Sequence, residues 1–267
     1  MPPTAHGYLT CPGRWSEPGA GPDCCRHSDH RAQGYGIQMS SRVLGADACT
    51  AGWVGVVLHD GAATVHVAKT IAALVADAEV NGHLAVIGID IPIGLPDTGR
   101  RAADVLAYQR VGARRSSVFM TPVRAALEAS TYAAAVQVNR DRAGEGFSAQ
   151  VYGLRSKILE VDGWVRHAQR RVVEVHPEAS FAELAGGPLR DGKRTWAGAH
   201  HRRRLLADAG IDLADDVGQA GRLAAVDDVL DAAAAVWTAA RAAAGAATPL
   251  PDPPVEYSDG WPAAIWV

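Results

Sequence analysis

The sequence predicts an α/β protein built on a mixed five-stranded sheet, in which three antiparallel strands come before parallel strands and helices flank the sheet. Short apolar or alternating segments between residues 43 and 68 have the pattern of strands joined by tight turns. The stretch LAVIGID at 84–90 is apolar at nearly every position, as in a strand buried on both faces. Alanine-rich segments with helical spacing follow later in the chain.

Five consecutive segments predict the first four strands of the sheet and one helix between the third and fourth strands. The first strand ends at Asp47, and GWVGVVLHDG at 52–61 predicts a second strand that closes in a hairpin turn. The stretch 63–69 alternates as a third strand. A helix capped by Thr70 comes next, and the fourth, central strand ends at Asp90.

The second half is predicted to be mainly helical. A helical insertion is expected around 98–167, followed by a fifth strand that ends near Glu174. A helix begins around Pro177, another ends at Gly210, and the last long helix ends at Gly245. The proline-rich segment after it closes with AAIWV, which is expected to add at most an edge strand.

The N-terminal residues differ in composition from the rest. Residues 1–38 are rich in Gly, Pro, Arg, Ser and His and have no periodicity, which predicts a disordered tail. Met39 directly precedes the patterned region, so the natural start is hypothesised to lie there, with 39–267 forming a single domain. Possible zinc ligands in the tail have no familiar spacing, and we expect no zinc site from them. They are Cys11, Cys24, Cys25, His27 and His30.

Composition narrows the class of protein. Hydrophobic residues make up 48% of the 267 residues, enough for a core, and the net charge of −3 gives no global field that attracts nucleic acid. Local basic patches remain compatible with nucleic-acid binding. No apolar run is long enough to span a membrane, and no secretion signal is apparent, so a cytoplasmic location is expected.

Two acids end neighbouring strands of the predicted sheet. If the fourth strand pairs in parallel with the first, Asp47 and Asp90 lie at the same edge of the sheet. Two close carboxylates repel each other unless a cation lies between them. Magnesium and manganese prefer oxygen ligands, so either ion meets this need. The sequence therefore predicts a divalent metal site beside these two residues.

The last long helix adds further acids. Asp228 and Asp231 lie about 60° apart around the helix axis, next to an apolar face that includes Leu230 and Trp237. Both are predicted to lean toward the strand ends. The neighbouring Asp227 also fits a simpler role, because acids are favoured at the positive end of the helix dipole.

Five motifs occur in an order that resembles a known family. They are GADACTAGWVGVVL, GIDIPIGLP, RRSSVFMTPVR, EVHPEASF and DDVLDA. Together they resemble domain-of-unknown-function family 429, described as predicted nucleases of ribonuclease-H-like fold, over nearly all of the chain from Val43 onward. The wider superfamily, which includes Holliday-junction resolvases, places acids on the first strand, the fourth strand and the last helix. Asp47, Asp90, Asp228 and Asp231 match those positions.

The resemblance implies a hydrolase that cleaves phosphodiester bonds with two Mg²⁺ or Mn²⁺ ions. Asp47 would bridge the ions, Asp90 and Asp231 would each hold one, and Asp228 would assist. Glu174 is a further candidate catalytic acid, although it would serve equally as a helix cap. His176 would orient Glu174 or carry a proton, or would simply fill a polar pocket.

A nuclease also needs cations and hydroxyl groups that hold phosphates. RRSSVFMTP is expected to form a loop over the metal ions, and KRTWAGAHHRRR places a tryptophan among cations, which suits base stacking. Solvated helix faces are the simpler interpretation of both. The candidate substrate-binding residues are Arg114, Arg115, Ser116, Ser117, Arg124, Lys157, His176 and Lys193.

Three functions therefore remain open. The first is a metal-dependent nuclease that acts on RNA or structured DNA. The second is a nucleic-acid-binding or nucleotide-binding protein without catalysis. The third is an actin-like phosphotransferase, which would need a glycine-rich phosphate loop where the sequence has DACTAGW, with a single glycine, and a second domain copy that is not visible.

Overall fold

The computed structural model describes residues 41–267. Expectations for the N-terminal tail, and for the zinc ligands within it, lie outside the described residues. The structure described below therefore begins just before the first predicted strand.

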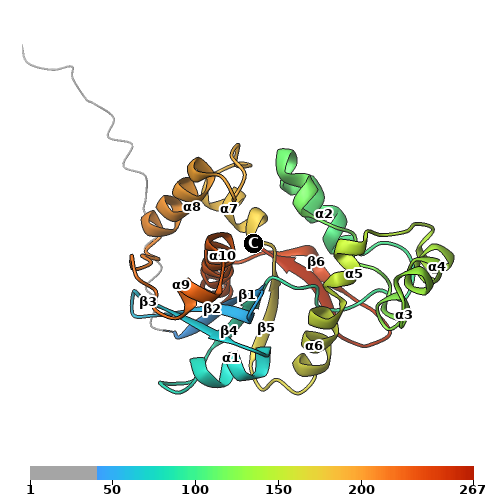
Figure 1. Cartoon of the computed structure of the whole chain (residues 1–267), viewed down its shortest axis with the longest axis horizontal. Helices are drawn as coiled ribbons and strands as arrows, with labels where there is room; N and C mark the ends of the chain where they lie inside the picture. Colours follow the sequence, from blue (N-terminus) through green and yellow to red (C-terminus); the bar gives the residue numbers. More distant parts are fainter. Residues whose placement is uncertain (1–40) are drawn as a thin grey trace, which may run out of the picture. The chain divides into compact units, whose positions relative to one another are not determined.

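A mixed sheet of seven strands forms the centre of residues 41–267 (Figure 1). The first three strands are antiparallel neighbours, while the first, fourth, fifth and seventh run parallel to one another. The sixth strand pairs antiparallel with the seventh. The spatial order is β3-β2-β1-β4-β5-β7-β6. The strands are β1 (Val43–Cys49), β2 (Gly52–His59), β3 (Ala62–Ala68), β4 (Val86–Ile89), β5 (Arg171–Val175), β6 (Pro249–Glu256) and β7 (Pro262–Trp266).

The expected five-stranded sheet is wrong in its number of strands. The C-terminal segment contributes two strands, and β7 lies inside the sheet between β5 and β6, not at its edge. The proline-rich segment itself is β6, which forms the outer edge. Proline has no N–H to donate to a second neighbour, so an edge position is the one that such a strand tolerates.

Helices account for slightly more than half of the residues from 41 to 267 that lie outside the strands. They are α1 (Ile71–Ala78), α2 (Ala102–Arg110), the 3-10 helix η1 (Gly112–Ser117), α3 (Arg124–Leu127), α4 (Tyr132–Ala143), α5 (Ala149–Gly153), α6 (Arg155–Val165), α7 (Pro177–Leu184), α8 (Trp196–Asp208), α9 (Ala220–Leu223) and α10 (Val226–Ala243). The predicted cap of α1 is confirmed, because the Thr70 side chain accepts a hydrogen bond from Ala73 N. No helix within residues 41–267 is both long and apolar enough to cross a membrane.

The helices cover both faces of the sheet. Figure 1 shows α10 on one side of the strands and α1 on the other. On the α10 side, one hydrophobic cluster joins α10 to β5, α7 and α8 through residues such as Val173, Phe181 and Leu206. On the opposite side, a second cluster joins α1 to β1 and α6 through Leu44, Leu74 and other apolar side chains.

Helix α10 approaches the sheet backbone to backbone at two glycines. A Cβ atom on Gly45 of β1 would lie 2.0 Å from Val236 N and 2.2 Å from Ala232 O. On β4, a Cβ atom on Gly88 would lie 2.7 Å from Ala235 O. Side chains two residues apart on a strand share a face, so the acid two residues after each glycine emerges on the side of α10.

The helical segment between β4 and β5 is held to the rest of the fold at two places. Near its start, Arg101 Nη2 donates to Glu174 Oε2 on β5 at 2.6 Å. Near its end, Glu160 Oε1 on α6 accepts hydrogen bonds from Trp53 Nε1 at 3.0 Å and from Ile71 N at 2.7 Å. The first contact joins the segment to β5, which follows it in the sequence, and the second joins it to β2 and α1, which precede β4. The segment is therefore anchored at both ends.

Replacing Gly45 with alanine is expected to destabilise the protein strongly. The new methyl group would overlap the α10 backbone, and we expect a loss in the free energy of unfolding of about 3 kcal/mol, the upper end for overpacked cores. Denaturant unfolding of Gly45→Ala measures the loss. Gly163→Ala is the matched control, because it lies exposed in α6 with no atom within 4 Å of the added Cβ. Gly163→Ala is expected to be neutral or slightly stabilising. Equal free energies of unfolding for Gly45→Ala and Gly163→Ala would contradict the close packing of α10 on β1.

Candidate functional site

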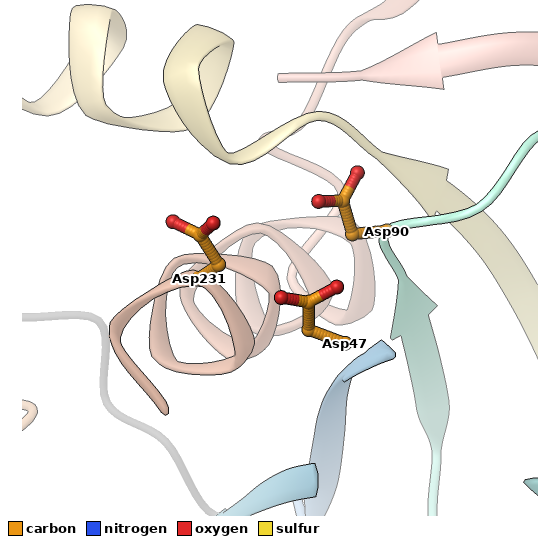
Figure 2. Close-up of side chains that lie close together, drawn as sticks. All are labelled: Asp47, Asp90 and Asp231. Atoms are coloured by element: carbon orange, nitrogen blue, oxygen red, sulfur yellow. The ribbon is translucent and has the colours of Figure 1, made fainter. Parts of the chain in front are cut away.

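Three carboxylates from three separate elements converge at one edge of the sheet. Asp47 lies near the end of β1, Asp90 directly follows β4, and Asp231 lies in the second turn of α10 (Figure 2). Each offers an oxygen atom such that the three oxygens lie within 4.8 Å of one another. The hydrogen bond from Asp90 N to Ala46 O, at 2.9 Å, fixes the start of the loop after β4 beside β1. Parallel pairing of β1 and β4, together with the close approach of α10, thus assembles the group.

The oxygens of these carboxylates differ in their partners. Asp47 Oδ1 accepts a hydrogen bond from Ala48 N at 2.7 Å. Asp231 Oδ2 accepts from Lys193 Nζ in an ion pair. Asp231 Oδ1 is buried and has no hydrogen-bond partner within residues 41–267. A buried carboxylate oxygen without a partner is costly in an apolar environment, so this atom points to a ligand.

Burial and mutual repulsion both act on the carboxylates. Burial, followed by the charges of Asp90 and Asp231, raises the pKa of Asp47 well above its ordinary value. Burial raises the pKa of Asp90 to about 7, although Lys193 opposes the shift. Burial likewise raises the pKa of Asp231 to about 7, against the pull of Lys193. For Lys193, burial would lower the pKa, but the ion pair with Asp231 raises it overall, so the ammonium group stays charged. Without a cation the site therefore resists full ionisation.

The three acids line a pocket of about 340 Å³. Its wall includes three of the predicted substrate-binding residues, namely Ser117, His176 and Lys193. Asp228 also lines the pocket, although it lies outside the group of three carboxylates. Its Oδ2 accepts a hydrogen bond from Ala225 N at 3.3 Å, which caps the start of α10.

Glu174 lines the same pocket but is occupied by other partners. Its Oε2 accepts hydrogen bonds from Arg101 Nη2 at 2.6 Å and from Ile93 N at 2.7 Å. Arg101, which is fully buried, also faces Asp104, whose Oδ2 accepts from Thr121 N at 2.7 Å. Glu174 therefore fixes the loop after Asp90. Arg101 and Asp104 had no distinguishing signal in the sequence.

One arginine of the basic cluster 202–204 on α8 is buried, although the sequence predicts a solvated helix face there. Arg202, grouped in the sequence with the exposed Arg203 and Arg204, has none of its surface exposed. Its Nη2 donates to both oxygens of Glu178 at 2.7 and 2.8 Å. The prediction of a solvated basic face is therefore wrong for Arg202, because Glu178 provides a buried partner from α7. In the sequence, only the second acid of the EVHPE motif, Glu178, could have indicated a partner for Arg202.

The remaining predicted substrate-binding residues lie outside the pocket lining. Arg114 Nε donates to Leu189 O at 3.0 Å, while Arg115 and Ser116 are exposed on η1. Arg124 is held by ion pairs with Asp162 and Asp259. Lys157 lies 4.7 Å from the centre of the Trp53 ring and 3.4 Å from Glu160. Arg124 and Lys157 thus have local structural partners.

The donor set fits a hard divalent cation. Asp47, Asp90 and Asp231 supply oxygen atoms only, which suits Mg²⁺ or Mn²⁺ better than softer metals. The unpartnered Asp231 Oδ1 gives such an ion a buried ligand. An ion bound there would also relieve the repulsion that raises the pKa values of the acids.

Comparison with known proteins places the chain in a family. Residues 45–256 match the model of the family described as "Protein of unknown function (DUF429)", so the chain belongs to that family. No curated protein and no solved structure matched the chain. Because the family description names no activity, the function has to be inferred from the site.

The metal-free protein is expected to become more stable as the pH falls toward neutrality. Asp90 and Asp231 have pKa values of about 7 in the folded chain but ordinary values of about 4 when unfolded. Between those values the folded state binds more protons, so its stability increases as protons are added. We expect the melting temperature to rise from about pH 8 to about pH 6.5, and Asp90→Asn to reduce that rise.

Thermal unfolding at several pH values, with and without Mn²⁺, measures this effect. The ion should raise the melting temperature most at high pH, since protons compete for the same oxygens. Asp212→Asn, at an exposed position in the segment between α8 and α9, is the control and should leave the pH dependence unchanged. An identical pH dependence in wild type and Asp90→Asn would contradict the raised pKa of Asp90.

Proposed function

We propose that the protein is a metal-dependent nuclease that hydrolyses phosphodiester bonds. The observation that carries the proposal is the convergence of Asp47, Asp90 and Asp231 in one pocket, with a buried Asp231 oxygen that has no partner in the described part of the chain. Lys193 in the same pocket adds a positive charge suited to a phosphate. Acids that hold divalent cations against a phosphate are a recurrent arrangement in nucleases.

The strand order supports a ribonuclease-H-like interpretation of the fold. Five consecutive strands follow the order β3-β2-β1-β4-β5, with β1 antiparallel to β2 and parallel to β4. The sequence pattern predicts three antiparallel strands followed by a strand parallel to the first, and this order sets acids from the first and fourth strands beside an acid of the last helix. Strands β6 and β7 extend that arrangement. Fold alone does not establish an activity, so the site carries the argument.

The residues of the pocket have separable roles in this proposal. Asp47, Asp90 and Asp231 would hold Mg²⁺ or Mn²⁺. When bound, the ion supplies Lewis-acid stabilisation of the charge that develops on the phosphate during hydrolysis. Lys193, whose side chain is 36% exposed, would donate its remaining N–H bonds to a phosphate oxygen. Glu174 and Arg101 would keep the loop after Asp90 in place.

His176 is the proposed general base. Its Nε2 lies 3.4 Å from Ser117 O, and a carbonyl oxygen only accepts, so Nε2 carries the proton and Nδ1 has a free lone pair. Nδ1 is buried and has no partner within residues 41–267, and burial lowers the pKa of His176, which keeps the ring neutral at pH 7. Water would then bond to phosphorus and lose its proton to Nδ1 as the bond from phosphorus to the leaving sugar oxygen breaks. The leaving oxygen would take a proton from solvent and depart as the alcohol.

An exposed aromatic pair next to the pocket supports a nucleic-acid substrate. Trp196 is 87% exposed and stacks on His200, with ring centres 6.5 Å apart and planes inclined by 10°. Lys193 of the pocket precedes Trp196 by three residues, a chain length of at most about 11 Å. Exposed Arg194 and Arg204 lie on the same segment. Aromatic rings among cations bind the bases of single strands.

Asp47→Asn is expected to abolish cleavage while leaving the fold intact. The change removes a metal ligand and also removes a buried negative charge from a crowded site, so stability in the absence of metal should not fall. The test incubates wild type and Asp47→Asn with Mn²⁺ and four substrates. These are single-stranded RNA, an RNA–DNA hybrid, single-stranded DNA and a four-way junction. Cleavage by wild type alone would support the nuclease and identify its substrate.

Two other outcomes count against this function. Equal cleavage by wild type and Asp47→Asn would show that the activity arises elsewhere. No cleavage of any substrate by a folded wild type that binds metal would favour the alternative of a nucleic-acid-binding or nucleotide-binding protein without catalysis. Trp196→Ala then becomes the more informative variant, because its effect is on binding.

Trp196→Ala is expected to weaken binding of single strands about tenfold, since one stacked base contributes on the order of 1–3 kcal/mol. Fluorescence anisotropy with a labelled oligonucleotide measures it in an Asp47→Asn background, which prevents cleavage. Trp196→Phe keeps an aromatic ring and should retain most of the affinity. Hydrolysis of a small activated phosphodiester by Trp196→Ala should equal that of wild type. Unchanged oligonucleotide binding would show that the aromatic pair is not a base platform.

A further inference from the structure

Lys193 is an unusual component of a site formed by acids. It lies in the loop between α7 and α8, and its Nζ donates to Asp231 Oδ2. The charges of Asp90 and Asp47 also act on it. A permanent cation thus already lies among the three carboxylates of the proposed metal site. Its presence bears on how many metal ions the site accepts.

The carboxylates have few oxygens left for metal. One oxygen of Asp231 is held by Lys193, and one oxygen of Asp47 is held by the backbone N–H of Ala48. An acid that bridges two ions commonly gives one oxygen to each. With one oxygen of each acid engaged, Asp47 and Asp231 each retain a single oxygen without a hydrogen bond, so neither has a free oxygen for each of two ions. Asp90 is the one acid of the three whose oxygens accept no hydrogen bond within the described part of the chain.

The spacing of the three acids also matches one ion. Oxygens around an octahedral Mg²⁺ at about 2.1 Å lie about 3.0 Å apart when adjacent and about 4.2 Å apart when opposite. The three ligand oxygens lie within 4.8 Å of one another, so small side-chain adjustments bring them around a single centre.

The charges lead to the same number. Three carboxylates carry a charge of −3, Lys193 contributes +1, and a single divalent ion brings the sum to zero. A second divalent ion would leave an excess of +2 on this group. The half-buried Asp228, which also lines the pocket, would offset only half of that excess, and uncompensated buried charge is costly. Removal of the lysine charge would restore the need for a further cation.

We propose that the site binds one divalent ion and that Lys193 takes the place of a second ion. This inference rests on the proposed nuclease function and replaces the two ions expected from the sequence. The ammonium group neutralises Asp231 and presents its exposed side to the substrate phosphate, the position in which a two-ion centre would use a metal. Lys193 therefore sets the metal stoichiometry as well as contacting substrate.

The test counts bound Mn²⁺ by isothermal titration calorimetry and by electron paramagnetic resonance of free Mn²⁺. Wild type is expected to bind one ion per chain, and Lys193→Met, which has a side chain of similar length without the charge, is expected to bind two. Arg194→Met is the matched control, since it removes a charge from the adjacent exposed position. Both Arg194→Met and the charge-conserving Lys193→Arg should bind one ion.

The outcomes separate this inference from the proposed function. Two ions in wild type, or one ion in folded Lys193→Met, would overturn the role of Lys193 and leave the metal site in place. Binding of no Mn²⁺ by wild type, or binding that Asp90→Asn does not weaken, would overturn both. The wild-type count decides the stoichiometry by itself if Lys193→Met does not fold.

Discussion

The candidate site depends on the backbone contact between α10 and the sheet. Gly45 and Gly88 leave room for the helix to lie directly on β1 and β4, and the helix meets them with alanines at 232 and 235. Larger residues at these positions would move the axis of α10 outward, because helix–sheet distances follow side-chain size. Asp231 would then lie away from the strand ends. The position of an acid is thus set by residues that have no functional groups.

Holding three carboxylates together opposes stability, and the surrounding fold offsets that cost. Nearly all residues of α10 from Val229 to Ala242 are buried, so the helix has strong apolar contacts that resist the repulsion around Asp231. The ion pair with Lys193 offsets part of the charge. Functional sites commonly show this conflict between local electrostatics and overall stability, and the raised pKa values of Asp47 and Asp90 are its signature here.

The hydrophobic pattern of the sequence predicts the strands whose side chains alternate or are continuously apolar. Alternation and apolar runs predict β1 to β5, and the chain order of these strands predicts that Asp47 lies beside Asp90, as the structure confirms. The proline-rich β6 has no strand pattern, so neither it nor the interior position of β7 was predicted. The pairs Arg101–Glu174 and Arg202–Glu178 join residues far apart in sequence. Their burial depends on partners that no periodicity reveals, so the sequence alone indicates Glu174 as a candidate catalytic acid and does not show its pairing with Arg101.

The two attachments of the helical segment between β4 and β5 bear on how fast ligands can enter and leave the pocket. Arg101 ties its beginning to β5, and Glu160 ties its end to β2 and α1. A segment with a single attachment can swing as a lid, and the opening step then limits how fast ligands enter or leave. With a buried attachment to β5 at one end and a partly buried attachment to β2 and α1 at the other, this segment forms a fixed wall of the pocket. Access of ligands to the acids is then governed by diffusion and charge, without a gating motion of this wall.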